Sequence, residues 1–208
     1  ERAIINLGGI ANITRLPADP AEPVIGFDSG PANCLMDAWF ARHHDGRPMD
    51  RNGEWALSGS CISPLLEQLL TDPYLARPAP KSTGREYFNL DWLMPHLDPQ
   101  WSAKDVQRTL LELTVESLIK ALMTQKRPVD AIFLCGGGAH NKALVQRLQT
   151  RLPQTRVDDT GALSVPADDV EAIAFAWLAM RRWRGLPGNL PSVTGAQHSV
   201  SLGGIYAP

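Results

Sequence analysis

The segment VDAIFLCGGGAHN, residues 129–141, constrains the fold of this chain more than any other segment. Its first seven residues form an almost unbroken apolar run that ends in three glycines, and residues 141–152 then have the pattern of a helix. A strand that is apolar on both faces and flanked by helices usually lies inside a sheet that is covered on both sides. We therefore expect an α/β protein in which helices pack on a central sheet.

The first part of the chain predicts three more strands and a helix. Residues 3–7 and 10–16 have the pattern of a hairpin around a glycine turn, and residues 24–27 of a third short strand. From Asn33 to His44, apolar residues recur at helical spacing. Asp28 then falls at the end of the third strand, directly before the expected turn at residues 29–31.

The rest of the chain predicts further helices and short strands from periodicity and capping signals. The tail beyond residue 190 is irregular, with one possible strand near Leu202. The other expected elements are a helix over 64–70, a long helix that begins with the Ser102-x-x-Asp105 capping pattern and ends near Arg127, a strand over 155–157, and a helix over 168–184 that Gly185 closes.

Composition excludes several classes of function. The chain has 208 residues and a net charge of -2, which gives no electrostatic reason to bind nucleic acid or an anionic membrane. No apolar run approaches the roughly 18 residues that a membrane span needs. Three scattered cysteines without a CxxC spacing favour a reducing cytoplasm over a zinc site or a disulfide framework. Because a strand-like run begins almost at Glu1, we expect the sequence to be a fragment.

Two glycine turns are candidate binding sites. Gly8-Gly9 and Gly136-Gly137-Gly138 each follow an apolar strand, and the second turn precedes a helix. Glycine allows backbone N–H groups to approach a phosphate closely, but it also serves tight turns that need a positive φ. Neither turn matches the P-loop or the GxGxxG pattern. Two such turns together favour a nucleotide cleft, and the purely structural interpretation stays open.

Two acidic residues are candidates for chemistry. Asp28 could act as a general base or help to hold a metal-bound phosphate, or it could simply cap the turn that follows it. Glu171 could face a cleft, although Asp168, Asp169 and Glu171 also fit a first helical turn, where the helix dipole favours acids.

Several segments occur together in an order that resembles the anhydro-N-acetylmuramic acid kinase family. That family belongs to the superfamily of sugar kinases, actin and heat-shock chaperone ATPases, and the resemblance covers essentially the whole chain. It implies the second lobe of an actin-like, ribonuclease H-like ATPase fold, with a mixed sheet and flanking helices. Residues 1–186 would form this lobe, and residues 187–208 a tail that returns toward a first lobe. The segments are INLGGIANIT, GFDSGPANCLMDAW, PKSTGREYF, FLCGGGAHN, EAIAFAWLA and NLPSVTGA.

The resemblance also implies roles for individual residues. Asp28 corresponds to the catalytic aspartate of the family, which draws a proton from the attacking water. The chain departs from the usual family motif at Ser29 and Ala32, where threonine and glycine are typical. The implied nucleotide-binding residues are Gly8, Gly9, Gly136, Gly137, Gly138 and Asn141, and the implied sugar-binding residues are Asn12, Ser29, Gly30 and Glu171.

The family reaction would open the 1,6-anhydro bond of the sugar with water and transfer the γ-phosphoryl group of ATP to its 6-oxygen. ATP and Mg²⁺ are the implied cofactors, and the ATP phosphates rather than protein side chains would hold the metal. The resemblance further implies a cytoplasmic homodimer that recycles cell-wall sugar. Since the first phosphate loop of the family lies in a segment that this chain lacks, we expect little activity from the chain by itself.

Two alternatives remain beside the kinase. A glycoside-type hydrolase could use Asp28 and Glu171 as paired carboxylates without ATP. An actin-like ATPase lobe could instead serve assembly, with no sugar chemistry. The first would leave the triple-glycine turn without a role, and the second would show nucleotide-dependent self-association.

Overall fold

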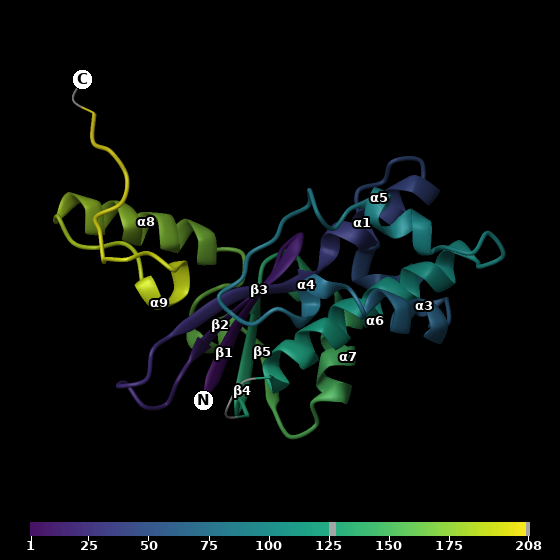
Figure 1. Cartoon of the computed structure of the whole chain (residues 1–208), viewed down its shortest axis with the longest axis horizontal. Helices are drawn as coiled ribbons and strands as arrows, with labels where there is room; N and C mark the ends of the chain where they lie inside the picture. The colour runs from purple at the N-terminus through teal and green to yellow at the C-terminus, as the bar shows by residue number, and fades with distance from the viewer. Residues whose placement is uncertain (125–127, 207–208) are drawn as a thin grey trace.

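A computed structural model describes residues 1–124 and 128–206 of the chain. Its centre is a five-stranded mixed sheet with the order β3-β2-β1-β4-β5 (Figure 1). The first three strands are antiparallel neighbours, whereas β4 and β5 extend the sheet in parallel with β1. The strands are β1 (Arg2–Leu7), β2 (Ile10–Leu16), β3 (Ile25–Pro31), β4 (Ala131–Cys135) and β5 (Arg156–Asp159).

One face of the sheet carries the hydrophobic core. Alternate residues of β1 are fully buried, as a strand with one core-facing side requires, and the long helix α6 (Ala103–Met123) packs on that side with its neighbours. The expected apolar stripe of α6 is buried, and so are residues on its other sides, because helices surround it (Figure 1). These helices are α1 (Asn33–His43), α2 (Glu54–Leu57), α3 (Ser63–Leu69) and α7 (Lys142–Arg151).

Short elements complete the chain between these helices and strands. Among the described residues, no helix is both long enough and apolar enough to cross a membrane, and this includes α6. The short elements are η1 (Arg51–Gly53), α4 (Pro73–Ala76), α5 (Leu90–Leu93), η2 (Met94–His96), η3 (Gly137–His140) and η4 (Thr160–Leu163).

The last two helices lie on the opposite side of the sheet. Figure 1 shows α8 (Val170–Trp183) extending away from the rest of the molecule, and none of its residues is buried. The short helix α9 (Pro191–Thr194) returns to the sheet, where the Val193 side chain packs so closely on Gly26 of β3 that a Cβ there would lie 2.6 Å from it. The tail therefore touches the sheet on its less covered face.

The structure confirms most of the expected elements and corrects the third strand. β3 continues to Pro31 because β2 pairs with it on both sides of a bulge at Ser29, with Asn12 opposite Asp28 and Ile10 opposite Pro31. Asp28 therefore lies inside a strand, and the turn expected at residues 29–31 is wrong. The alternative role of Asp28 as a cap of that turn is wrong for the same reason.

The ends of the later helices also test the sequence analysis. Ser102 caps α6 by accepting a hydrogen bond from the Asp105 N–H at 3.3 Å, as expected. The helix ends at Met123, earlier than expected, and Arg127 itself lies outside the described residues. Gly185, with φ of 64°, closes α8. The strand expected near Leu202 is absent from the described part of the tail, where Leu202 is exposed.

Candidate functional site

A row of polar side chains crosses the sheet from β3 to β4. Asn12 of β2 lies opposite both Asp28 of β3 and Asn6 of β1, and Asn6 lies opposite Cys135 of β4. Residues opposite one another in a sheet share a face, so these four side chains line the face away from the buried core. The sequence analysis found Asp28 and Asn12 and missed Asn6, whose only signal was a polar residue at the end of an apolar strand.

The carboxylate of Asp28 is held by three hydrogen bonds. The Asn12 side-chain amide donates to its Oδ1 at 2.9 Å, and the Ser82 hydroxyl and the Thr83 backbone N–H donate to its Oδ2 at 2.9 and 3.0 Å. Donors from two different segments fix the carboxylate in one orientation on the half-exposed face of the sheet. Such an arrangement suits a base that must receive a proton at a defined point.

The backbone of Asp28 is held as firmly as its side chain. Its N–H donates to the Lys81 carbonyl at 3.1 Å, and the Tyr74 hydroxyl donates to its carbonyl at 2.7 Å. Burial raises the pKa of Tyr74, and the negative charge of Asp28 raises it further, so this hydroxyl keeps its proton and stays a donor. Residues 81–83 therefore form a strap that binds Asp28 at its backbone and at its carboxylate.

The first glycine turn is seated on the N-terminus of α1. The Gly8 carbonyl accepts from the Asn33 N–H at 3.1 Å, and the Gly9 carbonyl accepts from the N–H groups of Ala32 and Cys34 at 3.0 Å. The Asn33 side chain donates to the carbonyls of Leu7 and Gly8, both at 2.8 Å. The helix N-terminus thus supports the turn, and a phosphate at this site would meet the turn itself.

Arg85 lies over this turn, and the sequence analysis missed it. A Cβ on Gly9 would lie 2.5 Å from the Arg85 Nε, so the guanidinium rests directly on the glycine. Asp37 of α1 is close enough to Arg85 for the two charges to interact. Burial raises the pKa of Asp37 to about 6, Arg85 opposes the rise and Asp50 adds to it. A cation at a turn that could bind phosphate is a strong candidate for a phosphate contact.

The second glycine turn lies against the first strand. A Cβ on Gly136 would collide with the Asn6 side chain, and one on Gly138 would lie 2.6 Å from the Leu7 Cβ. Gly137, in contrast, faces open space within 4 Å. Packing therefore requires two of the three glycines, and the middle one is free of any such requirement. The buried Oδ1 of Asn6 beside this turn has no hydrogen-bond partner among the described residues.

The remaining predicted site residues lie in different surroundings. Glu171 lies near the end of β4, since its charge adds to the effect of burial in raising the pKa of Cys135. Asn141 caps α7 by accepting from the Leu144 N–H at 3.2 Å. Ser29 is buried, and its hydroxyl donates to the Ala11 carbonyl at 3.2 Å. A Cβ on Gly30 would meet the Leu75 side chain at 2.8 Å.

The site contains no obvious protein cage for a metal ion. Within residues 1–124 and 128–206, no group of three or more His, Cys, Asp or Glu side chains is placed to hold one. The pair His43 and His44 packs on aromatic rings instead, with His44 stacked on Phe40 at 4.0 Å between ring centroids.

Comparison with known proteins gives a consistent family. The family model described as anhydro-N-acetylmuramic acid kinase matches residues 1–208. A curated anhydro-N-acetylmuramic acid kinase from Nitrosomonas europaea is 55% identical over 206 residues, which are 99% of this chain and 56% of that protein. This chain therefore spans just over half the length of the curated relative.

Among solved structures, the chain is similar to an activator of the 2-hydroxyisocaproyl-CoA dehydratase from Clostridium difficile with bound ADPNP. The TM-score is 0.41 with 14% sequence identity, over 76% of this chain and 53% of the other chain.

Proposed function

Because this chain belongs to the anhydro-N-acetylmuramic acid kinase family, we propose that its protein is an ATP-dependent sugar kinase. The reaction opens the 1,6-anhydro bond of anhydro-N-acetylmuramic acid with water and phosphorylates the freed 6-oxygen, giving N-acetylmuramic acid 6-phosphate. The observation that carries the proposal is the Asp28 carboxylate, oriented by three donors in a sheet whose strands β1 and β4 each end at a glycine turn.

Asp28 receives a proton from the attacking water in this proposal. A positioned carboxylate base typically contributes about 10²–10⁴-fold to the rate. Asn12, Ser82 and the Thr83 N–H keep the carboxylate oxygens in place while the sugar binds over the row of polar side chains. Glu171, near the end of β4, contacts the sugar from the other side of this row.

The two glycine turns bind the nucleotide. Gly8 and Gly9 approach its phosphates, with Arg85 beside them as a cation, and Gly136 to Gly138 approach the adenosine side with Asn141. The space in front of Gly137 fits this role, because neither packing nor a positive φ requires a glycine there. Mg²⁺ held by the ATP phosphates would neutralise part of their charge during the transfer.

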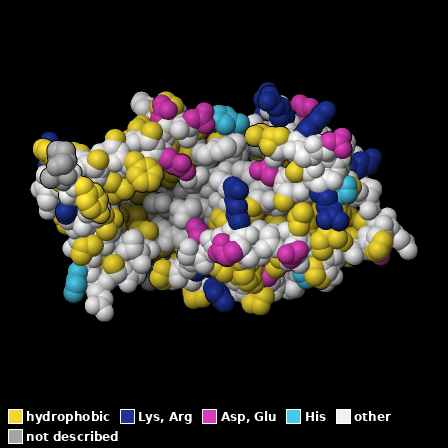
Figure 2. All heavy atoms as spheres, turned by 90° about the horizontal axis from the view of Figure 1, so that it is seen from above, with side chains coloured by type: hydrophobic (Ala, Val, Ile, Leu, Met, Phe, Trp, Pro, Cys, Tyr) yellow, Lys and Arg dark blue, Asp and Glu magenta, His cyan; other side chains and the backbone are white. Residues whose placement is uncertain are grey.

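We also propose that the described fold is one lobe of a larger protein. The exposed helix α8 and the tail from residue 187 would contact a second lobe, and the nucleotide and the sugar would bind between the lobes. Figure 2 shows hydrophobic side chains gathered at the end of the molecule where α8 and the tail lie. From the family resemblance we also propose that the full-length protein forms a homodimer, and light scattering would test this.

The decisive experiment uses a protein of the relatives' full length that contains this chain. It is incubated with Mg-ATP and the 1,6-anhydro sugar in oxygen-18 water, and the product is analysed by mass spectrometry. We expect a sugar 6-phosphate with the label at its anomeric oxygen, and its loss in Asp28→Asn. Asp45→Asn, at an exposed turn, is the control and should keep full turnover.

Other outcomes would overturn the proposal. Labelled sugar without phosphate, formed at the same rate without ATP, would favour the glycoside-type hydrolase. ATP hydrolysis that drives self-association and ignores the sugar would favour the actin-like assembly protein.

A further inference from the structure

A cavity lies next to the strap, and Asp28 is not among the residues that line it. Its volume is about 880 Å³, and residues from four segments line it. Its floor includes Ile25 and Phe27 of β3, its walls come from residues 75–81 and the loop after β2, and the C-terminal end of α6 closes one side. Nothing in the proposed kinase reaction uses this cavity.

The cavity gathers positive charge. Arg77, Lys81 and Lys120 line it, and no acidic side chain among the described residues forms an ion pair with any of them. Burial lowers the pKa of Lys81, the charges of Lys120 and Arg77 lower it further, and the charge of Asp28 opposes part of this change. Lys81 therefore lies close enough to Lys120 and Arg77 to interact with both. Arg15 and Glu22 also line the cavity, and Arg15 contacts Glu1 at 3.4 Å.

The three cationic side chains that line the cavity favour the binding of a doubly charged anion. Bringing three cations together without acids in contact costs free energy, which an anion between them would recover. An arginine and two lysines present the donors that a phosphate group prefers. The apolar side chains of Ile25 and Phe27 on the floor and of Leu75 in the wall leave room for a small organic group beside the phosphate.

We propose that this cavity binds the phosphate monoester of a small organic molecule through Arg77, Lys81 and Lys120, and that binding changes how residues 81–83 hold Asp28. The connection is short. The Lys81 ammonium donates to the carbonyls of Tyr74 and Leu75 at 3.1 and 3.4 Å, and its own carbonyl accepts from the Asp28 N–H. A phosphate that attracts the ammonium weakens its two bonds to residues 74 and 75. The backbone at Lys81 then shifts, directly before the Ser82 hydroxyl and the Thr83 N–H that donate to the Asp28 carboxylate.

The test measures binding directly and does not depend on the proposed kinase activity. Glucose 6-phosphate is titrated into the full chain by calorimetry, with inorganic phosphate and glucose as separate probes. We expect saturable binding of glucose 6-phosphate, weaker binding of phosphate and none of glucose. Arg77→Gln and Lys120→Gln should each weaken binding by roughly tenfold, which is the loss of one charge-assisted contact. Arg47→Gln, in an exposed loop, is the matched control and should bind normally.

A second readout follows the strap. Hydrogen exchange of the Thr83 amide, which donates to the Asp28 carboxylate, should change when glucose 6-phosphate is added and should not change in Arg77→Gln. Binding that survives both Arg77→Gln and Lys120→Gln but is lost in Arg85→Gln would place the phosphate at the glycine turns and overturn the inference. The absence of saturable binding would overturn it as well. Unchanged exchange at Thr83 with normal binding would overturn the link to Asp28.

Discussion

Arg85 and Gly9 are the two residues whose contact most changes the description of the site. A side chain at position 9 and the guanidinium of Arg85 cannot occupy the same space, because the Cβ would lie 2.5 Å from the Nε. Gly9 does not have a positive φ, so the backbone of the turn does not itself require a glycine there. The glycine leaves room for a cation next to a candidate phosphate site.

This contact predicts that two different substitutions have one effect. Gly9→Ala displaces the Arg85 side chain, and Arg85→Ala removes it, so each should weaken binding of a non-hydrolysable ATP analogue by about tenfold. The double variant should bind no more weakly than either single variant, since the second change has nothing left to remove. Calorimetry on the full-length protein measures this, with Arg47→Ala as the control. Fully additive losses would show that Gly9 and Arg85 act separately.

Asp37 predicts a pH dependence of stability. Burial raises its pKa in the folded protein to about 6, above the ordinary aspartate value of 3.8. The folded state therefore binds more protons than the unfolded state between these values, and stability falls as the pH rises through this window. Asp37→Asn cannot ionise and should be more stable than the parent protein by on the order of 1 kcal/mol at pH 7.5, since partial exposure reduces the effect.

The difference between the two proteins should almost disappear near pH 4. Urea unfolding at both pH values measures it, and Asp45→Asn serves as the control with parallel curves. An Asp37→Asn protein that is equally stabilised at both pH values would contradict the assignment to ionisation.

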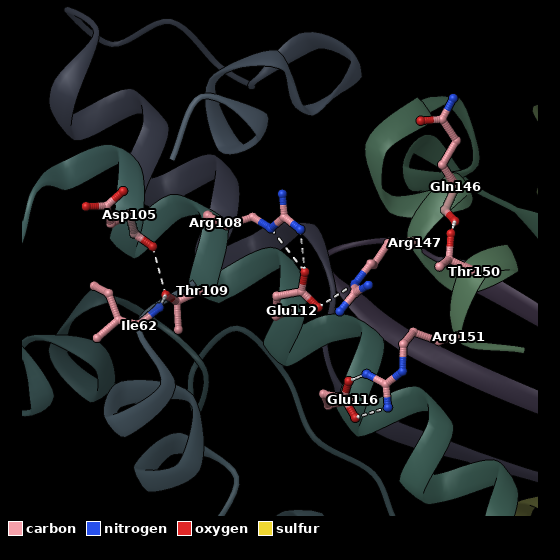
Figure 3. A network of polar contacts seen from close by, with 10 residues as sticks. All are labelled: Ile62, Asp105, Arg108, Thr109, Glu112, Glu116, Gln146, Arg147, Thr150 and Arg151. Carbon is pink, nitrogen blue, oxygen red and sulfur yellow. Dashed lines mark hydrogen bonds and ion pairs between the residues drawn. The ribbon is translucent and has the colours of Figure 1, made fainter. Parts of the chain in front are cut away.

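At the scale of elements, α6 and α7 are joined by a network of charged side chains (Figure 3). Glu112 of α6 is buried and accepts from Arg108 at 2.8 Å and from Arg147 of α7 at 2.8 Å. One turn further along, Glu116 pairs with Arg151 in a more exposed position. α7 follows the second glycine turn directly, so this network helps to fix where that turn lies.

The two pairs should differ in their contribution to stability. Glu112→Gln weakens two charge-assisted hydrogen bonds to partly exposed arginines and should lower the free energy of unfolding by about 1.5–3 kcal/mol. Glu116→Gln removes a more exposed pair and should cost at most about 1 kcal/mol. Chemical denaturation of both variants makes the comparison, with Glu116→Gln as the matched control. Equal losses would mean that burial of Glu112 adds nothing to the pairing.

At the scale of the whole molecule, α8 is the element without a place in the core. Phe175 is 72% exposed and Trp183 is 80% exposed, which is unusual for large apolar side chains on one helix. Two of the six tryptophans, Trp177 and Trp183, are also exposed on this helix.

Substitutions on α8 should matter only in the larger protein. Phe175→Ser together with Trp183→Ser should leave the melting temperature of the 208-residue chain unchanged. In the full-length protein, the same change should remove about 1.5–3 kcal/mol for each side chain that the second lobe covers. Met49→Ser, at another exposed apolar residue, is the control. A small effect in both proteins would show that α8 stays uncovered, and a loss in the short chain that depends on its concentration would indicate a second copy.

The sequence by itself determined the elements and the glycine turns. The apolar run before Cys135, the capping pattern at Ser102 and the periodicity of α6 depend on neighbours within a few residues, and the structure has strands and helices at these places. Family resemblance selected Asp28, and local patterning found the strand before it. All of these signals are local, which is why a sequence can carry them.

Only the tertiary structure decided how the site is assembled. β3 continues past Asp28 because β2 pairs with it to Pro31, and no pattern within residues 25–31 contains that information. Arg85 reaches Gly9, and Asn12 and Thr83 meet at Asp28, across long separations in the chain. Such contacts depend on how the sheet, α1 and the strap pack together. Packing sums many weak interactions over the whole molecule, and no short segment of sequence determines it.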